Sequence, residues 1–354
     1  MAESTTVPWN NLGSSGLKIS NVIIGCMSYG SKEWADWVIS DEEKVYEILN
    51  KAYELGIRTF DTADMYSNGV SEILLGKWIK KYNIKRDKIV IMTKVFNPVD
   101  EDIEDLFKKQ IRGFTKAEEV EIINSRGLSR KHILDGAQES VRRLGTYIDL
   151  YQIHRFDHEV PMEETMRALN DVVEQGHARY IGASTMRAVE FVMLQNVAEK
   201  NGWHKFVSMQ SKYNLLDRED EHEMNYYCQK TGVGLIPWSP LAAGMLARPV
   251  PEVLDDSNIT ARQKNGRGKI SAQDKDKVAD ITIINRVEEV AKKLNVPMAA
   301  VATAWALAKG TNPIAGISSV KRLEELFVGA NLKLSEEDIK YLEEPYLPKL
   351  RDIR

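Results

Sequence analysis

The sequence predicts an α/β fold, a single (β/α)8 TIM barrel domain over residues 1–354. Short runs of β-branched residues alternate with helical patterns along the chain, and eight such runs occur. A chain of 354 residues is long for one ordinary domain, but barrels of this class reach that length as one unit. We expect the barrel at about residues 20–332 and a C-terminal helix and tail at 333–354.

The elements are predicted in a regular order. A turn signal from Asn11 to Gly16 indicates an N-terminal β-hairpin. The eight predicted strands are Val22–Ile24, Thr59–Asp61, Ile89–Lys94, Ile148–His154, Arg179–Ser184, Phe206–Gln210, Gly234–Trp238 and Pro313–Gly316. The predicted helices are Glu43–Leu55, Glu72–Tyr82, Arg130–Leu144, Glu163–Glu174, Ala188–Lys200, Glu221–Thr231, Ile284–Leu294 and Ala299–Lys309.

An open, doubly wound sheet is the alternative to a closed barrel. Its dinucleotide-binding form needs a glycine-rich turn directly after the first strand. The residues from Gly25 to Gly30 lack that glycine spacing. The alternation therefore favours the barrel.

Two long segments, 95–128 and 247–281, interrupt the alternation. The second contains a charged run from Lys264 to Lys269. Loops that follow the strands of a barrel build its active site, so each segment is a candidate lid or substrate wall at the C-terminal face of the strands. An idle surface insertion is the alternative interpretation.

The composition excludes several classes of partner. Hydrophobic residues make up 43% of the chain, and a net charge of -4 gives no electrostatic reason to expect nucleic acid or membrane binding. Cys26 and Cys228 lie far apart without metal-ligand spacing, so we expect buried thiols, no disulfide and no metal site. Without a signal-peptide core or a run of about 18 apolar residues, we expect a cytoplasmic protein. No protein partner is indicated.

Four polar residues, Asp61, Tyr66, Lys94 and His154, lie at or just after the ends of predicted strands. In a barrel of parallel strands these ends meet on one face, so the four side chains are expected to lie together. A phenol ordinarily has a pKa of about 10 and needs a neighbouring cation to exchange protons near neutral pH. A lone Tyr or His would indicate packing, but the combination predicts a proton-transfer site.

The segment from Gly56 to Tyr66, continued by Gly69, Ser71-Glu72 and Leu75-Gly76, resembles the signature of the aldo-keto reductase family. Further matches follow in the order of that family: Thr93-Lys94, Asp149 to His154, Gly182 to Ser184, Gln210, Ile236 to Leu241, Pro313 to Gly316, and Ser318. The stretch Trp238 to Leu241 resembles the branch that contains aryl-alcohol dehydrogenase-like reductases and potassium-channel β subunits.

The resemblance implies an NADPH-dependent oxidoreductase that reduces small carbonyl substrates, aldehydes above all, with aryl aldehydes and ketones included. Tyr66 would be the general acid, Lys94 would stabilise its phenolate, Asp61 would hold Lys94, and His154 would donate a hydrogen bond to the substrate oxygen. The residues implied to contact NADPH or NADP⁺ are Met27, Asp61, Ser184, Gln210, Trp238, Ser239, Leu241, Gly244, Arg248, Ser318, Arg322 and Glu325.

The resemblance also implies which part of the cofactor each of these residues would contact. Ser184 and Gln210 would bind the carboxamide, and Trp238 would stack on the nicotinamide ring. Ser239, Leu241 and Gly244 would line the pyrophosphate, Ser318 and Arg322 the 2′-phosphate, and Glu325 the adenine. An Arg fits that phosphate because its planar fork can donate two hydrogen bonds at once.

Two further expectations concern substrate and role. The aromatic residues near the expected mouth, Tyr29, Trp34, Trp37 and Phe96, predict a flat, apolar pocket. A regulatory subunit that keeps the barrel and the cofactor, and reports redox state to a partner as channel β subunits do, would carry the same four polar residues. That alternative stays open at the level of the sequence.

Overall fold

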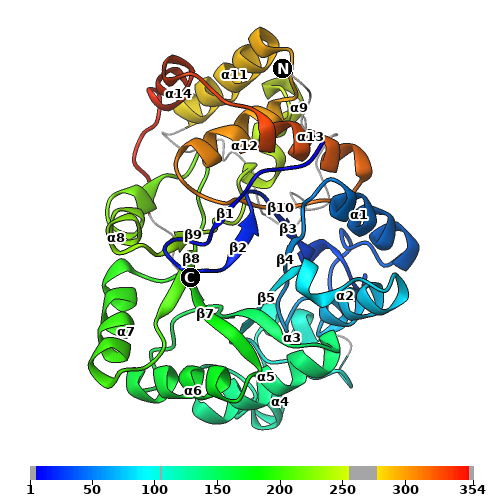
Figure 1. The fold of residues 1–354 in the computed structure, drawn as a ribbon, viewed down its shortest axis with the longest axis vertical. Coiled ribbons are helices and arrows are strands. Elements are labelled where there is room, and N and C mark those ends of the chain that lie inside the picture. The colour runs from blue at the N-terminus through cyan, green and yellow to red at the C-terminus, as the bar shows by residue number, and fades with distance from the viewer. Residues whose placement is uncertain (1–4, 104–105, 255–276, 351–354) are drawn as a thin grey trace.

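The computed structural model describes residues 5–103, 106–254 and 277–350, in which eight parallel strands form one curved sheet surrounded by helices (Figure 1). The strands of this sheet are β3 (Ile23–Gly25), β4 (Thr59–Asp61), β5 (Val90–Val95), β6 (Ile148–Ile153), β7 (Ala178–Ser184), β8 (Phe206–Gln210), β9 (Gly234–Leu235) and β10 (Ile314–Gly316). From β3 to β9 each strand pairs with the next in sequence, and β10 pairs with β3. A parallel bridge between Trp238 and Ile314 joins the two remaining edges, so the predicted (β/α)8 barrel is confirmed.

The helices predicted between the strands are present. They are α1 (Glu42–Glu54), α2 (Val70–Lys81), α5 (Arg130–Leu144), α6 (Met162–Glu174), α7 (Ala188–Asn201), α8 (Met224–Thr231), α11 (Lys277–Leu294) and α12 (Met298–Ala308). After the last strand come α13 (Val320–Asn331), which is not among the predicted helices, and α14 (Glu336–Glu343), which lies in the predicted C-terminal helix and tail. Their starts have local causes: the Asp41 carboxylate accepts from two backbone N–H groups at the start of α1, and the Ser129 hydroxyl caps α5. None of the helices in the described ranges is both long and apolar enough to cross a lipid bilayer.

Several predicted boundaries shift. The helix expected from Glu221 begins at Met224 and follows a separate 3-10 turn, η3 (Glu219–Glu221). The described part of α11 begins at Lys277, seven residues before the predicted start. Strand β9 is shorter than predicted, because regular pairing ends at Leu235 and Trp238 makes only isolated bridges.

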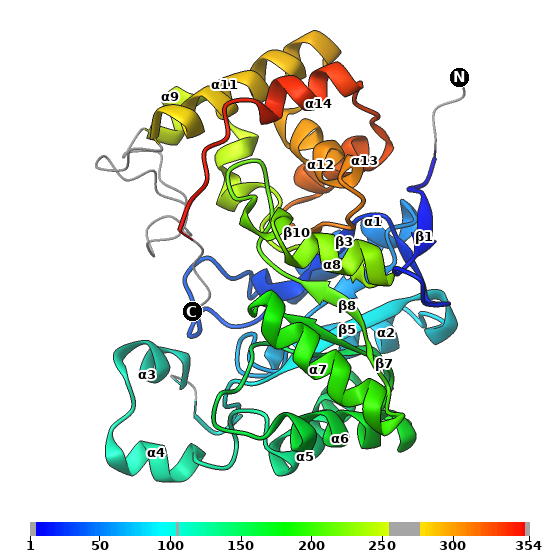
Figure 2. The same ribbon diagram turned by 90° about the vertical axis from the view of Figure 1, so that its left-hand side faces the viewer.

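The N-terminal hairpin closes one end of the barrel. Strands β1 (Trp9–Asn11) and β2 (Lys18–Ser20) pair in antiparallel fashion, as predicted. Leu12 and Ile19 are fully buried in a cluster with residues of the barrel interior, Met92 and Leu150 among them. Figure 2 shows the hairpin at the end of the barrel opposite to α3 and α4. A functional site is therefore left to the C-terminal ends of the strands.

Alternate side chains of each strand point into the barrel, and near the C-terminal ends of β5 and β6 these inward side chains are polar. In β5 and β6, Ile91 and Tyr151 pack in the layer between sheet and helices, whereas Met92 and Leu150 belong to the interior cluster. Two residues further along each strand, the interior positions are Lys94 and Gln152. The pattern that builds the core thus also places the first polar groups of the site.

Both long segments contain helical residues that the sequence pattern does not predict. Residues 95–128 include α3 (Leu106–Arg112) and α4 (Lys116–Ile122), which project beyond the barrel in Figure 2. Residues 247–281 include α9 (Val250–Leu254) and the start of α11. The run from Lys264 to Lys269 lies outside the described residues.

Candidate active site

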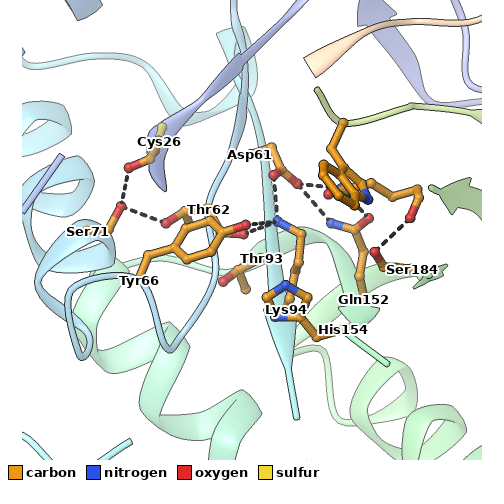
Figure 3. Close-up of polar contacts among 12 residues, drawn as sticks. Cys26, Asp61, Thr62, Tyr66, Ser71, Thr93, Lys94, Gln152, His154 and Ser184 are labelled. Atoms are coloured by element: carbon orange, nitrogen blue, oxygen red, sulfur yellow. Dashed lines mark hydrogen bonds and ion pairs between the residues drawn. The ribbon is translucent and has the colours of Figure 1, made fainter. Parts of the chain in front are cut away.

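Three of the four polar residues singled out from the sequence form a continuous contact chain inside the barrel (Figure 3). The Nζ atom of Lys94 lies 2.6 Å from Oδ2 of Asp61 and 3.2 Å from the hydroxyl oxygen of Tyr66. It also donates to the backbone oxygen of Thr62 at 2.8 Å. Lys94 is only 1% exposed, so its charge is held by these partners rather than by water.

His154 completes the group from the end of β6. Its ring stands nearly perpendicular to the Tyr66 ring, at 80°, with centroids 5.9 Å apart. No described residue forms a hydrogen bond with its side chain, and Nδ1 is buried without a partner. The imidazole is therefore free to bond a ligand next to the phenol.

The charge states follow from burial and neighbours. Burial alone would lower the pKa of Lys94, but the adjacent Asp61 and Tyr66 outweigh it and raise that pKa, so the ammonium form is kept. Burial, followed by the nearby Lys94 and Arg155, holds the pKa of His154 well below its usual value. A neutral imidazole beside a permanent cation is the result, and it can act as a hydrogen-bond donor without adding charge.

Asp61 is held by two amide side chains in addition to Lys94. Nε2 of Gln152 donates to Oδ1 of Asp61 at 3.0 Å, and Nε2 of Gln210 donates to the same atom at 2.9 Å. The two glutamines also bond each other at 3.0 Å. Both carboxylate oxygens are thus occupied, which fixes the anion that anchors Lys94.

Gln152 was missed by the sequence reading. The signal was present, because Gln152 lies two residues before His154 on the same strand and therefore on the same inward face.

The turn that carries Tyr66 is strained and firmly tied. Ser67, Asn68 and Gly69 have φ angles of 50°, 53° and 90°, in the left-handed region that favours glycine. The Asn68 side chain donates to the backbone oxygens of Asp100 and Ile103 and accepts from the N–H of Asp100. The turn bearing the phenol is thereby attached to the segment that leads into α3.

A buried group of charged side chains packs near the turn that carries Tyr66. Nε of Arg143 lies 2.6 Å from Oε2 of Glu72, and both side chains are almost completely buried. Thr93 donates to the other oxygen of Glu72 at 2.5 Å. Burial and then the Glu72 charge raise the pKa of Asp64 well above its usual value. These residues join α2, α5 and β5 beneath the phenol.

A first set of candidate cofactor residues adjoins the Asp61 carboxylate. Ser184 donates to the backbone oxygen of Gln210 at 2.7 Å, and both residues are buried. The half-buried Trp238 donates from its indole Nε1 to Thr185 at 3.2 Å. Ser184 ends β7, Gln210 ends β8 and Trp238 follows β9, so the three residues lie at the C-terminal ends of neighbouring strands.

A second set lies on the turn after β9 and is mostly half-buried. Ser239, Ala242, Ala243 and Gly244 have positive φ angles of 60°, 47°, 55° and 94°, and a Cβ atom added at Gly244 would meet nothing within 4 Å. Left-handed turns built from small residues can direct N–H groups toward an anion. In this turn the N–H groups of Ala242 and Gly244 already donate to the Ser239 and Leu241 oxygens. Leu241 begins the 3-10 segment η4 (Ala242–Ala247) in this turn, and Arg248 follows it with Nε 3.5 Å from the Gly244 oxygen.

The remaining predicted residues lie at the start of α13 and beside the phenol. Nη1 of Arg322 donates to the Ser318 hydroxyl at 2.6 Å, with both side chains exposed at the helix N-terminus, and the half-buried Glu325 follows about one turn later. An exposed guanidinium at the positive end of a helix suits a phosphate group. Met27 packs instead against the cluster that contains Tyr66. The cofactor residues predicted from the sequence therefore lie partly on the half-buried turn after β9 and partly at the exposed start of α13.

The aromatic pocket differs in part from the prediction. Trp34 and Trp37 pack with Tyr66 as expected, but Tyr29 is buried in the main core and Phe96 packs against that core. Phe107 of α3 takes the predicted place of Phe96 and stacks on Trp34 with ring centroids 4.4 Å apart. The sequence reading missed Phe107 because it did not predict α3.

Other chemistry has little support in the described part of the chain. Residues 5–103, 106–254 and 277–350 contain no group of three or more His, Cys, Asp or Glu side chains arranged to hold a metal ion. Cys26 and Cys228 are free and buried, as predicted. Burial raises the pKa of the Cys26 thiol, so the unreactive protonated form is favoured there.

Comparisons with known proteins agree with this geometry. Residues 21–346 match the model of the aldo/keto reductase family. A protein of Schizosaccharomyces pombe named "Putative aryl-alcohol dehydrogenase" is 58% identical over 339 residues, which cover 95% of each chain. The versiconal hemiacetal acetate reductase of Aspergillus parasiticus is 51% identical over 340 residues, 96% of each chain. A second protein named "Putative aryl-alcohol dehydrogenase", from Saccharomyces cerevisiae, is 51% identical over 339 residues, again 96% of each chain.

Proposed function

The chain belongs to the aldo/keto reductase family, and we propose that it catalyses the NADPH-dependent reduction of aldehydes to alcohols, with aryl aldehydes and ketones among its substrates. One observation carries the proposal: the Tyr66 phenol lies 3.2 Å from the buried ammonium of Lys94, which in turn lies 2.6 Å from Asp61. Such a phenol can lose a proton to a substrate oxygen and keep a stabilised phenolate. Relatives named as a reductase and as aryl-alcohol dehydrogenases support the same reaction class.

The side chains divide the chemistry between them. NADPH, when bound, supplies a hydride to the carbonyl carbon. Tyr66 gives its phenolic proton to the carbonyl oxygen, and Lys94 stabilises the phenolate that remains, itself held in place by Asp61. The neutral His154 donates one hydrogen bond to the same oxygen, which polarises the carbonyl and fixes its direction.

The cofactor is proposed to bind along the residues described above. Ser184 and Gln210 contact the carboxamide, Trp238 stacks on the nicotinamide, and Met27 and Asp61 complete that end. Ser239, Leu241, Gly244 and Arg248 hold the pyrophosphate, Ser318 and Arg322 the 2′-phosphate, and Glu325 the adenine. The exposed Arg322 at the start of α13 is the reason to propose NADPH rather than NADH.

Tyr66→Phe tests the proposal directly. The ring volume is kept and only the acidic hydroxyl is removed, so kcat/KM for aldehyde reduction is expected to fall by at least about 100-fold, the usual effect of losing a general acid. The dissociation constant for NADPH, followed by protein fluorescence, should stay unchanged. Tyr226→Phe is a matched control, because Tyr226 is 62% exposed on α8.

The same assay separates the enzyme from the regulatory alternative. The purified chain alone, with NADPH and a panel of aromatic and aliphatic aldehydes, should oxidise NADPH at a rate that depends on the aldehyde. Tight NADPH binding without turnover on any aldehyde would contradict the proposal and favour a regulatory subunit. Near-normal turnover by the Phe variant would show that Tyr66 is not the acid.

A further inference from the structure

Gln152 lies in the middle of a hydrogen-bonded group, and the proposed reaction gives it no role. It is opposite Lys94 in the pairing of β5 with β6, and its side chain points toward Asp61 inside the barrel (Figure 3). Its Nε2 donates to Oδ1 of Asp61 at 3.0 Å, and its Oε1 accepts from Nε2 of Gln210 at 3.0 Å. Gln152 is fully buried, so water does not compete for these bonds.

A glycine on the strand between them allows the two glutamines to meet. Gln152 belongs to β6 and Gln210 to β8, and β7 lies between these two strands in the sheet. Gly182 is the residue of β7 that pairs with Gln152. A Cβ atom at Gly182 would come within 3.2 Å of Cγ of Gln152 and within 2.5 Å of the Ser208 hydroxyl on β8. Because Gly182 has no side chain, Gln152 can reach across β7 to Gln210.

The Asp61 carboxylate determines which end of each amide faces it. Its Oδ1 lies 3.0 Å from the amide of Gln152 and 2.9 Å from the amide of Gln210. An ionised carboxylate only accepts hydrogen bonds, so the nearest atom of each amide must be the NH2 nitrogen. The second N–H of Gln210 is taken by Oε1 of Gln152. The oxygen of the Gln210 amide therefore points away from Asp61.

Oε1 of Gln210 is an acceptor to which no group in the described part of the chain donates. Unlike Nδ1 of His154, it is not sealed from its surroundings as a buried, unpaired atom. It belongs to the last residue of β8, whose backbone oxygen accepts from Ser184. In the proposed function the nicotinamide carboxamide binds at Gln210 and Ser184. An acceptor held in this way suits the NH2 group of the carboxamide and not its oxygen.

We propose that Gln152 is a positioning residue for the cofactor: it holds the Gln210 amide so that the amide oxygen accepts the N–H of the nicotinamide carboxamide. A single bond from Gln210 to Asp61 would leave the amide plane free to turn about that bond. Both hydrogens of an amide NH2 lie in the amide plane, so a second bond, to Gln152, fixes the plane. This inference rests on the proposed function and adds to it a residue that sets how the cofactor is recognised.

The same bonds relate the carboxamide position to the proposed acid. Oδ1 of Asp61 accepts from the two glutamines, whereas Oδ2 accepts from Lys94, which in turn contacts the hydroxyl of Tyr66. One carboxylate thus places both the residue that would bind the carboxamide and the cation beside the phenol. A shift of the Gln210 amide should therefore lower turnover as well as affinity.

The test compares NADP⁺ with its 3-acetylpyridine analogue, in which a methyl group replaces the NH2 group of the carboxamide. The two dinucleotides have nearly the same size and both keep the carbonyl oxygen, but only NADP⁺ offers the N–H donor. Calorimetric titration of the unmodified chain should give a dissociation constant about 2- to 12-fold lower for NADP⁺, the range of one net hydrogen bond. Binding is measured without substrate, so the ratio does not depend on turnover.

Two variants remove the hydrogen bonds of Gln152 and keep a side chain of similar size. Gln152→Met is unbranched and close to Gln in shape, and Gln152→Leu gives the same loss of polar atoms with a different shape. In both variants the two dissociation constants should become nearly equal. Gln195→Leu is the matched control, because Gln195 is also a buried glutamine but bonds the backbone N–H and oxygen of Phe206 at the start of β8. It loses structural hydrogen bonds and should keep the preference for NADP⁺.

The outcomes distinguish this inference from the proposed function. Equal dissociation constants in the unmodified chain, or an unchanged preference in Gln152→Met, would overturn the role of Gln152 and leave the aldehyde reductase standing. An equal loss of the preference in Gln195→Leu would also overturn it, because general damage would then explain the effect. An unmodified chain that binds neither dinucleotide would overturn both proposals. If Gln152→Met fails to fold, Gln152→Leu supplies the same comparison.

Discussion

The residues proposed to be catalytic and those proposed to bind the cofactor's phosphates lie in the same barrel, but they differ in burial and in how their polar groups are paired. Asp61 and Lys94 are 2% and 1% exposed, and each oxygen of Asp61 and the ammonium of Lys94 already has partners within the chain. Arg322 and Ser318, by contrast, are exposed, and within the described ranges their side chains bond each other and no other side chain. The turn from Ser239 to Gly244 is likewise half open, with several left-handed residues.

The difference fits the roles proposed for the two groups, the buried half around Asp61 and Lys94 and the exposed half around Ser318 and Arg322. Stabilising a developing phenolate requires charges that are fixed in advance and shielded from water, so the buried half is organised without any ligand. Binding and releasing an anionic cofactor requires donors that water can reach, which is consistent with the exposed Arg322 guanidinium and Ser318 hydroxyl. Substitutions in the buried half should therefore affect folding as well as activity, whereas substitutions in the exposed half should affect binding alone.

The largest expected effect is that of Lys94→Met in the buried half. The change strands the Asp61 carboxylate without its cation, which should lower the free energy of unfolding by about 3–5 kcal/mol and nearly abolish aldehyde reduction. Urea unfolding and NADPH oxidation measure the two effects.

A double variant separates the stranded charge from the lost catalyst. Asp61→Asn combined with Lys94→Met removes the unpaired carboxylate, so much of the stability should return while activity stays lost. An equal loss of unfolding free energy in the single and double variants would mean that the unpaired Asp61 carboxylate is not the cause of the instability.

The next effect concerns the exposed half. Arg322→Ala removes a guanidinium that is proposed to contact the 2′-phosphate, and a charge-assisted hydrogen bond contributes about 1.5–3 kcal/mol, so the KM for NADPH should rise at least about tenfold. The KM for NADH and the unfolding free energy should barely change. Lys321→Ala is the control from the same helical turn. An equal rise for both cofactors would instead indicate general damage to α13.

The barrel could be predicted from the sequence because the alternation of strand and helix patterns is repeated many times along the chain. Eight strand patterns with helical patterns between them allow few other arrangements, and errors of a few residues at Glu221 or Ile284 do not change the topology. The positions of the four polar residues Asp61, Tyr66, Lys94 and His154 were predictable for a related reason. A residue at the end of a barrel strand is placed by the strand itself, so order along the chain translates into nearness in space.

The long loops could not be predicted in the same way. Helices α3 and α4 have seven residues each, too short for a clear hydrophobic period, although Thr115 and Glu118 form a capping box that marks the start of α4. The stack of Phe107 on Trp34 and the Asn68 bonds to Asp100 and Ile103 join loops distant in sequence. Such contacts depend on the final loop conformation, and no local pattern encodes them.

A smaller effect tests one of these loop contacts. Asn68→Gly keeps a residue that tolerates the left-handed φ of 53° but removes the three hydrogen bonds to residues 100 and 103. The KM for aldehydes should rise several-fold, because the segment leading to Phe107 loosens, while NADPH affinity stays constant. Asn83→Gly is the matched control, since Asn83 also has a positive φ, 50°, but lies after α2. Identical KM values for the two variants would show that Asn68 does not position the substrate wall.

The last prediction, with the smallest expected effect, concerns pH and the buried half. The pKa of Asp64 is raised well above the usual 3.8 by burial and then by Glu72, so the folded state binds this proton more tightly than the unfolded state does. Its contribution to stability is fully present below pH 3.8 and is lost as the pH rises through the folded-state pKa. Asp64→Asn keeps an oxygen to accept the Met65 N–H bond but cannot ionise. The free energy of unfolding in urea should be the same for the variant and the unmodified chain at low pH. As the pH rises, the variant should become increasingly more stable than the unmodified chain. Parallel curves for the two proteins at every pH would show that Asp64 does not titrate with folding.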